Sequence, residues 1–405
     1  MAVFQYTARD HMGRVISGVL EAENDTQVAN RLREMGLYIT GIERARAGPG
    51  ESRSFLETFR GISLRDLALM SRQFATMVNS GLSLVRSLSI LEQQVSNQKL
   101  REILGRVRAD VEEGHTLADS LAKHPQAFSS LYVNMVRAGE TGGVLDEVLQ
   151  RLSTFLEKEY ALRQKVKSAM VYPVILAVVA TAALLFMTMV IIPQFVVFFA
   201  ELNIRQLPLP TRILMAISYV LRTYWYVWMP IVAGAVYGFL RWLKTKRGKE
   251  WFDRVKLQIP IFGPVIQKTI IARFARTLGT LLSSGVPLLQ AFEVTGKATD
   301  NAVVEEGIVR VRSSIREGES IAVPLAAIEV FPPMVVQMVK VGEEAGNLDE
   351  MLIKVADFYD TEVETAVAAL ASTLEPAMIV FMGVVVGAMV ISLYLPIFQL
   401  AAEAG

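Results

Sequence analysis

The 405-residue sequence contains no cysteine, which excludes disulfides, zinc–thiolate sites and thiol nucleophiles. Histidine is scarce as well. His11, His115 and His124 lie apart and form no His-Glu-x-x-His pattern, so we expect none of them to bind a metal or act as a general base. The first twenty residues lack the continuous apolar core of a secretory signal. Any insertion into a membrane is therefore expected to rely on internal segments.

Sequence motifs of catalysis are absent too. The spacing nearest to a phosphate-binding loop runs from Gly13 to Gly18, but it continues into Val19 within an expected strand. No Gly-x-Ser-x-Gly elbow occurs, and the apolar segments hold no His or Asp for intramembrane hydrolysis. A net charge of +1 gives no global reason to bind nucleic acid. We predict a protein that is not an enzyme, with no catalytic residues, no cofactor and no metal.

Apolar residues, by contrast, make up 52% of the chain. The run from Val171 to Ile192 carries no charge, ends at Pro193 and follows a basic segment, Arg163–Lys167. About 20 helical residues cross a bilayer core roughly 30 Å thick. The run is therefore predicted to be a transmembrane helix.

Two further spans are predicted, at 219–243 and around Pro376–Pro396. Five Lys or Arg residues lie within Arg241–Lys249, directly after the second span. Basic residues mark the cytoplasmic ends of spans. We therefore expect a cytoplasmic N-terminus, an extracytoplasmic C-terminus and almost all of the polar mass in the cytoplasm.

Matched residues recur at a spacing of 203 or 204 positions, which indicates a tandem duplication. The matched pairs are Gly81 and Gly285, Gly114 and Gly318, Gly139 and Gly342, Pro173 and Pro376, and Pro193 and Pro396. Apolar residues at helical spacing before each repeated span predict about six short helices per copy.

The predicted fold class is a mainly α, polytopic membrane protein with a small N-terminal ββαβ unit. Its expected order is the ββαβ unit at 1–47, a linker at 48–63, a first cytoplasmic helical bundle at 64–168, transmembrane helix 1 at 169–195, a short extracytoplasmic loop at 196–218, transmembrane helix 2 at 219–243, a basic cytoplasmic linker at 244–266, a second cytoplasmic bundle at 267–373, transmembrane helix 3 at 374–399 and an extracytoplasmic tail at 400–405.

Each bundle contains a glycine–glutamate corner, Gly139-Glu140 in the first copy and Gly342-Glu343 in the second. Asp146 and Asp349 follow at matched positions. Glycine can end a helix, and a carboxylate can face the positive end of the next one. These residues are interpreted either as interhelical corners or as a docking surface for a cytoplasmic partner, and both interpretations stay open.

The spans carry their own candidates for packing. Gly234 with Gly238 and Gly383 with Gly387 form two GxxxG pairs, which allow helix backbones to approach closely. They suit either self-association or packing of the spans on each other. Glu375, immediately before Pro376, is either an interfacial helix-end residue or a contact between subunits.

A small-solute transporter is the competing membrane function. Carriers often have inverted repeats and ionisable groups at the bilayer midplane. Here the repeats are parallel and the expected midplanes are apolar, with Arg222 able to reach the interface. The sequence therefore disfavours a transporter.

The ββαβ unit, the paired corners and the repeated spans together resemble the inner-membrane platform family shared by type IV pilus assembly and type II secretion. Residues Gly342–Asp349 and Tyr394–Phe398 are more similar to the pilus branch. The resemblance implies a non-catalytic platform in the bacterial inner membrane. Its implied partners are a cytoplasmic hexameric assembly ATPase, pilin or pseudopilin subunits, inner-membrane alignment proteins and further copies of itself.

Some secretion members of that family bind calcium through carboxylates of the first bundle. The positions that match here are Ser96, Gln150 and Thr154, which have no carboxylate. Calcium is therefore not expected, and the resemblance assigns ATP to the partner.

Overall fold

The computed structural model describes residues 2–9, 15–22, 25–34, 36, 38–44, 61–201, 207–260 and 262–403. The chain separates into two compact units, Met1–Ser63 with Gln94–Glu102, and Leu64–Gln93 with Ile103–Gly405. Most of the expected linker at 48–63 lies outside the described residues.

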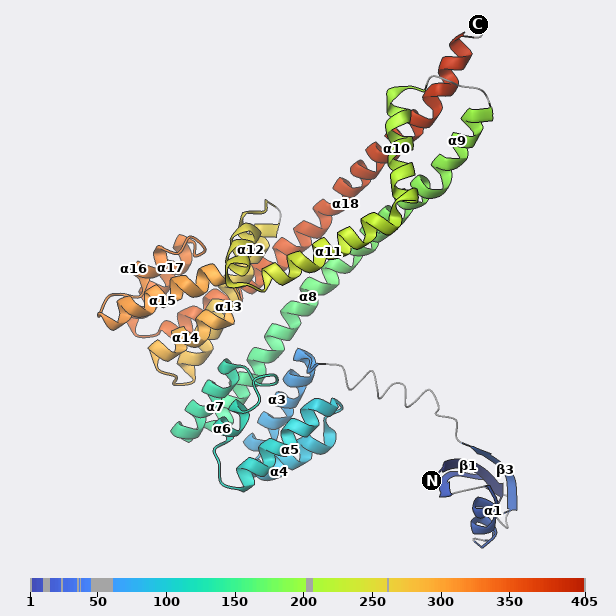
Figure 1. Ribbon diagram of the computed structural model, residues 1–405. Coiled ribbons are helices and arrows are strands. Elements are labelled where there is room, and N and C mark those ends of the chain that lie inside the picture. The colour runs from blue at the N-terminus through green and yellow to red at the C-terminus, as the bar shows by residue number, and fades with distance from the viewer. Residues whose placement is uncertain are drawn as a thin grey trace. The chain divides into compact units, whose positions relative to one another are not determined.

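The N-terminal unit is a three-stranded antiparallel sheet covered by one helix (Figure 1). Its elements are β1 (Ala2–Arg9), β2 (Val15–Ala22), α1 (Asp25–Glu34) and β3 (Tyr38–Arg44). The strand order is β2-β1-β3. Val28 and Leu32 share one face of α1 and are fully buried, as is Ala8 of β1. Gly36 follows the helix with φ +71°, a left-handed conformation that glycine adopts without strain. The predicted ββαβ unit is confirmed.

The first helical bundle precedes the first span. It consists of α3 (Leu64–Asn79), α4 (Leu84–Gln94), α5 (Gln98–Glu112), α6 (Leu117–Ala122), α7 (Ser130–Gly142) and the start of α8 (Leu145–Phe186). Met70 and Phe74 lie one turn apart on α3 and are buried, as are Leu149 and Leu152 of α8. Apolar residues at this spacing give each helix one buried face, which is why the bundle forms.

The second bundle repeats the first. It consists of α13 (Phe262–Ser283), α14 (Leu288–Ala298), α15 (Ala302–Arg316), α16 (Ala322–Ala326), α17 (Pro333–Ala345) and the start of α18 (Leu348–Glu403). Gly81 and Gly285 end the first helix of each copy at φ +85° and +81°. Gly114 and Gly318 do the same after the third helix, at +95° and +84°. The matched glycines of the duplication are therefore matched left-handed turns.

Three helices of the described chain are long and apolar enough to cross a membrane: Leu145–Glu201, Trp225–Leu243 and Leu348–Gln399. The first is continuous through α8, a π-helical turn η1 (Met187–Ile191) and α9 (Ile192–Glu201). Proline removes a backbone donor, and Pro193 follows directly after the π turn that accommodates this loss. Each of the three predicted spans therefore contains a helix of sufficient length and apolar character.

Helices α8 and α18 run side by side in the same direction (Figure 1). Lys158 pairs with Asp357 at 2.7 Å, Lys165 pairs with Glu364, and further along Tyr172 donates to Glu375 at 3.1 Å. Both members of each pair advance along the chain, which requires parallel helices. Each bundle immediately precedes one of these two helices, which we call the shaft helices. The two bundles therefore lie at the same end of the shaft.

The helical segment that leads from the end of the first span back to the second bundle is bent. It consists of α10 (Leu209–Thr223) and α11 (Trp225–Leu243), which meet at Tyr224. The Trp228 indole donates to the Leu221 carbonyl at 3.1 Å and so satisfies a backbone group at the bend. The second span was expected as one helix over 219–243, whereas the helix is interrupted within that range.

Helix α10 is fastened to both copies through carbonyls that proline leaves unpaired. Ser218 Oγ donates to the Thr188 carbonyl at 2.6 Å, and Thr211 Oγ donates to the Ser392 carbonyl. In the i→i+5 register of the π turn the donor for the Thr188 carbonyl would be residue 193, and in the α-helical register the donor for the Ser392 carbonyl would be residue 396. Both residues are prolines, which have no N–H. Unpaired carbonyls are costly within a bilayer. These two hydroxyls therefore tie the return helix to the same place in each repeat.

Two segments expected as connections contain helices. Helix α9 extends to Glu201 and α10 begins at Leu209, both within the expected loop at 196–218. Helix α12 (Lys246–Gln258) fills most of the expected linker at 244–266. Pro193 and the basic run were interpreted as helix ends. Instead, the helix continues through Pro193 because the π turn accommodates the missing N–H, and the basic run continues into the amphipathic helix α12.

Candidate docking site

The first corner is a helix-terminating motif built around Gly143. This residue follows α7 at φ +70°, and its N–H reaches the Glu140 carbonyl at 3.4 Å. The next N–H, from Val144, reaches the Gly139 carbonyl at 3.0 Å. This pair of bonds is a Schellman motif, which satisfies carbonyls at the end of a helix. Helix α8 starts immediately afterwards.

The second corner repeats this geometry. Gly346 has φ +70°, its N–H reaches the Glu343 carbonyl at 3.4 Å, and the Asn347 N–H reaches the Gly342 carbonyl at 3.0 Å. The two corners therefore agree bond for bond.

Gly139 and Gly342 allow the close approach of consecutive helices. A Cβ on Gly139 would lie 3.0 Å from Val148 Cβ, and a Cβ on Gly342 would lie 2.9 Å from the Leu348 Cα. The second contact is with backbone, which cannot rotate away. Each glycine therefore lets the helix that follows the turn pack against the helix before it.

The two corner carboxylates bind inside their own bundles. Glu140 accepts hydrogen bonds from the Leu117 and Ala118 N–H groups at 2.6 and 2.8 Å, at the start of α6. Glu343 accepts from the Ile321 N–H at 2.9 and 3.0 Å and from Ser320 Oγ at 2.7 Å, at the start of α16. A carboxylate stabilises a helix start in this way because it accepts otherwise unpaired donors. The geometry favours the interhelical-corner interpretation for both residues, and docking through them stays a prediction.

The surface beside the first corner is more accessible. Asp146 is exposed in the first turn of α8, whereas Asp349 is half-buried at the matched place. A pocket of about 450 Å³ lies between α7 and the α13–α14 turn. Asn134 and Gln290 bridge its two sides at 2.6 Å. The first corner therefore faces a hollow between the two bundles.

An ion pair that the sequence did not reveal links the first and last helix of each bundle. Arg72 of α3 donates to Glu157 of α8 at 2.7 Å, and Arg276 of α13 pairs with Asp360 of α18. The hydrogen bond from Arg72 lowers the pKa of Glu157, whereas burial raises the pKa of Asp360. The duplication could have identified these ion pairs in the sequence, because the two arginines and the two carboxylates occupy matched positions.

In the second copy, Arg276 is also linked to the first bundle through Asp357. Asp357 accepts from Arg276 at 3.0 Å and from Lys158 of α8 at 2.7 Å. Burial opposes ionisation of Asp357, but the hydrogen bonds from Lys158 and Arg276 lower its pKa. Arg273 of α13 adds a second link to α8, through Glu159 at 3.2 Å. Charged bonds thus join the two bundles along the start of the shaft.

The membrane candidates divide into two groups. No atom lies within 4 Å of a Cβ built on any of the four GxxxG glycines, apart from their own helix backbone and chain neighbours. A methyl group at these positions would therefore touch no other described residue, and self-association through these glycines stays a prediction. Glu375 contacts the first copy through Tyr172, its matched residue in the duplication.

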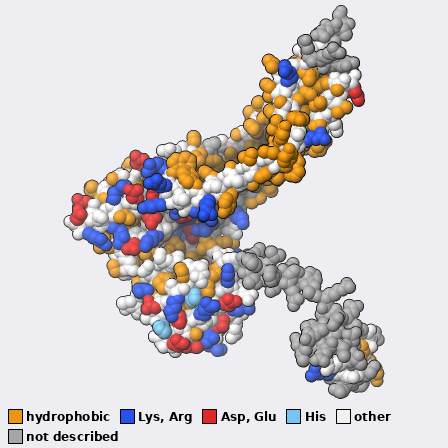
Figure 2. Space-filling model, viewed as in Figure 1, with side chains coloured by type: hydrophobic (Ala, Val, Ile, Leu, Met, Phe, Trp, Pro, Cys, Tyr) orange, Lys and Arg blue, Asp and Glu red, His pale blue; other side chains and the backbone are white. Residues whose placement is uncertain are grey.

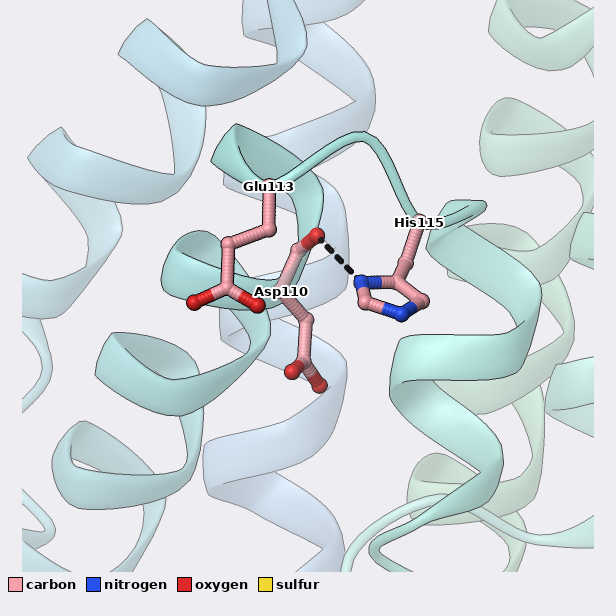
Figure 3. Close-up of side chains that lie close together, drawn as sticks. All are labelled: Asp110, Glu113 and His115. Carbon is pink, nitrogen blue, oxygen red and sulfur yellow. Dashed lines mark hydrogen bonds between the residues drawn. The ribbon is translucent and has the colours of Figure 1, made fainter.

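One group of side chains could hold a metal by geometry alone (Figure 3). Ligand atoms of Asp110, Glu113 and His115 lie within 4.8 Å of one another near the end of α5. The His115 Nδ1 lies 3.2 Å from the Asp110 carbonyl, and the Asp110 carboxylate pairs with Lys123 at 2.9 Å. Two of the three groups already have internal partners and two are exposed, so we assign no metal to them.

Comparisons with known proteins cover the whole chain. The family model described as type II secretion system protein F matches residues 70–193 and again 274–396, and the model of its N-terminal domain matches residues 1–43. A type IV pilus assembly protein PilC from Thermus thermophilus is 46% identical over 404 residues, covering 99% of this chain and 98% of the relative. The PilC protein of Myxococcus xanthus is 41% identical over 400 residues, covering 99% and 95%. A type II secretion system protein F from Pseudomonas aeruginosa is 36% identical over 401 residues, covering 99% of each.

Proposed function

Because this chain belongs to the type II secretion system protein F family, we propose that it is the inner-membrane platform of a type IV pilus assembly machine. In this role it couples a cytoplasmic assembly ATPase to the polymerisation of pilin subunits and catalyses no reaction itself. The observation that carries the proposal is similarity over 99% of the chain to proteins named for pilus assembly.

The pilus branch is favoured over the secretion branch by identity. The two pilus relatives share 46% and 41% of residues with this chain, whereas the secretion relative of equal coverage shares 36%. The alternative is a secretion platform that drives assembly of a pseudopilus, which would use the same architecture.

The proposed topology places both bundles in the cytoplasm. The parallel shaft helices put the bundles at one end, and the basic residues before the first span and after the second gather at that end. In this arrangement α9 and α10 lie toward the far side. A cytoplasmic ATPase can then reach both bundles without crossing the membrane.

Force applied to the bundles has a direct route into the membrane. Residues Leu145–Glu201 and Leu348–Gln399 are continuous helices that begin in the bundles and end beyond the spans. The links from Lys158 and Lys165 to α18 hold the two shafts in register where they leave the bundles. We infer that a displacement of the bundles moves both repeated spans together.

Asp146 and Asp349 are the better part of the predicted docking set to test, because Glu140 and Glu343 serve the bundles internally. Reversal of both aspartates to Lys is expected to weaken ATPase binding by the purified full-length chain. Glu344→Lys, an exposed reversal near the second corner, is the control. If the double reversal binds the ATPase as well as the control does, these corners are not the docking surface.

Deletion of the gene, followed by complementation with this chain, tests the function itself. The expected result is loss and recovery of surface pili, counted by electron microscopy, with secretion of exoproteins unchanged. Loss of secretion with normal pili would favour the secretion branch. Solute flux catalysed by the purified chain in liposomes would favour the transporter.

A further inference from the structure

The end of the second span carries a basic cluster that the proposed function does not use. Residues 241–256 contain seven Lys or Arg and two carboxylates, and we refer to this segment as the basic corner. Figure 2 shows Lys and Arg side chains gathered where the hydrophobic shaft meets the charged bundles. Five of the cations are exposed and form no ion pair with any described residue: Arg241, Lys244, Lys246, Arg247 and Arg254.

Asp253, one of the two carboxylates of the basic corner, is turned away from this surface. Asp253 is only 2% exposed and accepts a hydrogen bond from the Ala302 N–H at 3.0 Å. It also pairs with Lys256 at 3.1 Å. Lys249 is bound to Asp300 at 3.2 Å, at the start of α15. The second carboxylate, Glu250, lines a pocket with Lys246 and Lys249 and with Glu305 and Glu306 of α15. The exposed cations of the basic corner outnumber these three carboxylates, so the surface keeps a positive surplus.

The backbone fixes where this surplus lies. Thr245 caps α12 by accepting from the Gly248 N–H at 3.2 Å, two residues after α11 ends at Leu243. A Cβ on Gly248 would lie 2.1 Å from the Trp242 carbonyl oxygen, so only glycine fits where α12 turns back against α11. Lys246, the first residue of α12, is only three residues beyond Leu243, the last residue of α11. The cations are therefore held at the level where α11 leaves the hydrocarbon.

Aromatic residues line the same corner. The rings of Trp242 and Trp251 lie 5.4 Å apart, and those of Phe239 and Phe252 lie 6.3 Å apart, so α12 packs on the last turn of the span through its aromatics. Trp251 is nevertheless 52% exposed. Tryptophan prefers the headgroup level of a bilayer, where its ring meets apolar chains and its N–H meets polar groups.

We propose that the basic corner is a binding site for anionic phospholipid headgroups. Helix α12 lies in the interfacial layer, its Lys and Arg side chains bind headgroup phosphates, and Trp251 reaches toward the acyl chains. The positive N-terminal end of α12 adds to the attraction. Because Asp253 and Lys249 tie α12 to the start of α15, a bound lipid holds the second bundle at a set distance from the membrane surface.

This site goes beyond the proposed function and holds for a pilus or a secretion platform alike. Basic residues that only set the orientation of a span need charge and no fixed fold. Here the glycine turn and the aromatic contacts give the charges a defined place. Charge complementarity therefore favours an anionic lipid over a neutral one.

Lipid titration of the purified full-length chain in detergent tests the site, with bound lipids counted by native mass spectrometry. We expect phosphatidylglycerol to bind more tightly than phosphatidylcholine. Lys246→Gln with Arg247→Gln should weaken phosphatidylglycerol binding by about 25-fold, since each cation near an anionic headgroup contributes about fivefold. The matched control, Arg310→Gln with Lys340→Gln, removes two exposed cations from the second bundle and should leave binding unchanged. Equal affinity for the two lipids, or equal loss in both variants, would overturn the proposal.

Depth measurement provides a second test that does not depend on affinity. The chain has no cysteine, so Trp251→Cys can carry a single nitroxide label in vesicles that contain phosphatidylglycerol. We expect collisions with oxygen to exceed those with a water-soluble nickel chelate. A label at Arg310→Cys, in the second bundle, should show the reverse. If position 251 is as open to the chelate as position 310, α12 does not lie in the interface.

Discussion

Replacement of Glu343 by Ala should release the start of α16 while the rest of the second bundle stays folded. Glu343 accepts the Ile321 N–H and the Ser320 hydroxyl, and Ile321 is only 4% exposed. Hydrogen bonds to a charged group contribute about 1.5–3 kcal/mol each, and a buried donor left unpaired costs about 1–3 kcal/mol. The two ranges include part of the same free-energy cost and are therefore not added. We expect the local stability to fall by about 2–3 kcal/mol. Helix α16 has five residues, too few to stay folded by itself.

Hydrogen exchange followed by mass spectrometry measures this loss in the full-length chain. A penalty of about 2–3 kcal/mol corresponds to exchange roughly 30- to 150-fold faster at the amides of 320–326. Glu343→Gln keeps one acceptor oxygen, so its rate of exchange in this segment should fall between the rates of the wild-type chain and of Glu343→Ala. Glu344→Ala is the matched control, because Glu344 is exposed and lies 3.9 Å from Lys340. If Glu343→Ala and Glu344→Ala exchange alike in this segment, the carboxylate does not hold the helix start.

Three further predictions concern stability of the full-length chain. Arg276→Met should cost about 3 kcal/mol, because it removes a guanidinium that is only 8% exposed and leaves the half-buried Asp360 without its partner. Arg72→Met, at the more exposed matched pair, should cost about 1 kcal/mol or less. Thermal unfolding in detergent compares the two variants, and equal costs would contradict the burial argument. The double variant Ser218→Ala with Thr211→Val should lower the local stability of α10 by about 1 kcal/mol for each carbonyl that loses its hydroxyl donor. The loss should appear as faster amide hydrogen exchange in residues 209–223. The control Thr181→Val, on α8, should not change exchange in that segment. Burial lowers the pKa of His124, so the folded state resists a proton that the unfolded state accepts, and the stability of the fold should decrease as the pH drops below about 6.5. The variant His124→Gln should reduce this pH dependence, and an unchanged pH profile of stability in that variant would refute the role of His124.

Much of this architecture could be predicted from periodicity and repetition. The apolar run at 171–192 and its repeat fix two spans by length alone, and the matched glycines at 81 and 285 turn out to be matched left-handed turns. These features depend on properties of neighbouring residues, which one sequence records directly. The N-terminal ββαβ unit was predictable for the same reason.

Contacts between distant segments could not be predicted in this way. Nothing near Arg72 in the chain identifies Glu157 as its partner, because the pairing depends on how α3 and α8 pack. The sequence also gave no sign that Thr211 and Ser218 serve carbonyls freed by Pro396 and Pro193. Proline was interpreted as a helix end, whereas here the lost donor is compensated by another helix and the shaft continues.

The predicted docking residues show the same limit. Gly139 and Glu140 were predicted to form either an interhelical corner or a docking surface, but their type and spacing do not say whether the Glu140 carboxylate faces a partner or its own chain. The structure turns it toward α6. Asp146 keeps its carboxylate exposed and so remains available for an intermolecular role.

We propose that both helical bundles lie in the cytoplasm and are joined to the membrane by the parallel helices α8 and α18. Since the chain has no cysteine, single cysteines at Lys123, Glu344 and Glu201 can be labelled with a membrane-impermeant maleimide in intact cells. We expect positions 123 and 344, one in each bundle, to react only after the membrane is opened, and position 201 to react from outside. Labelling of position 344 in intact cells would contradict it.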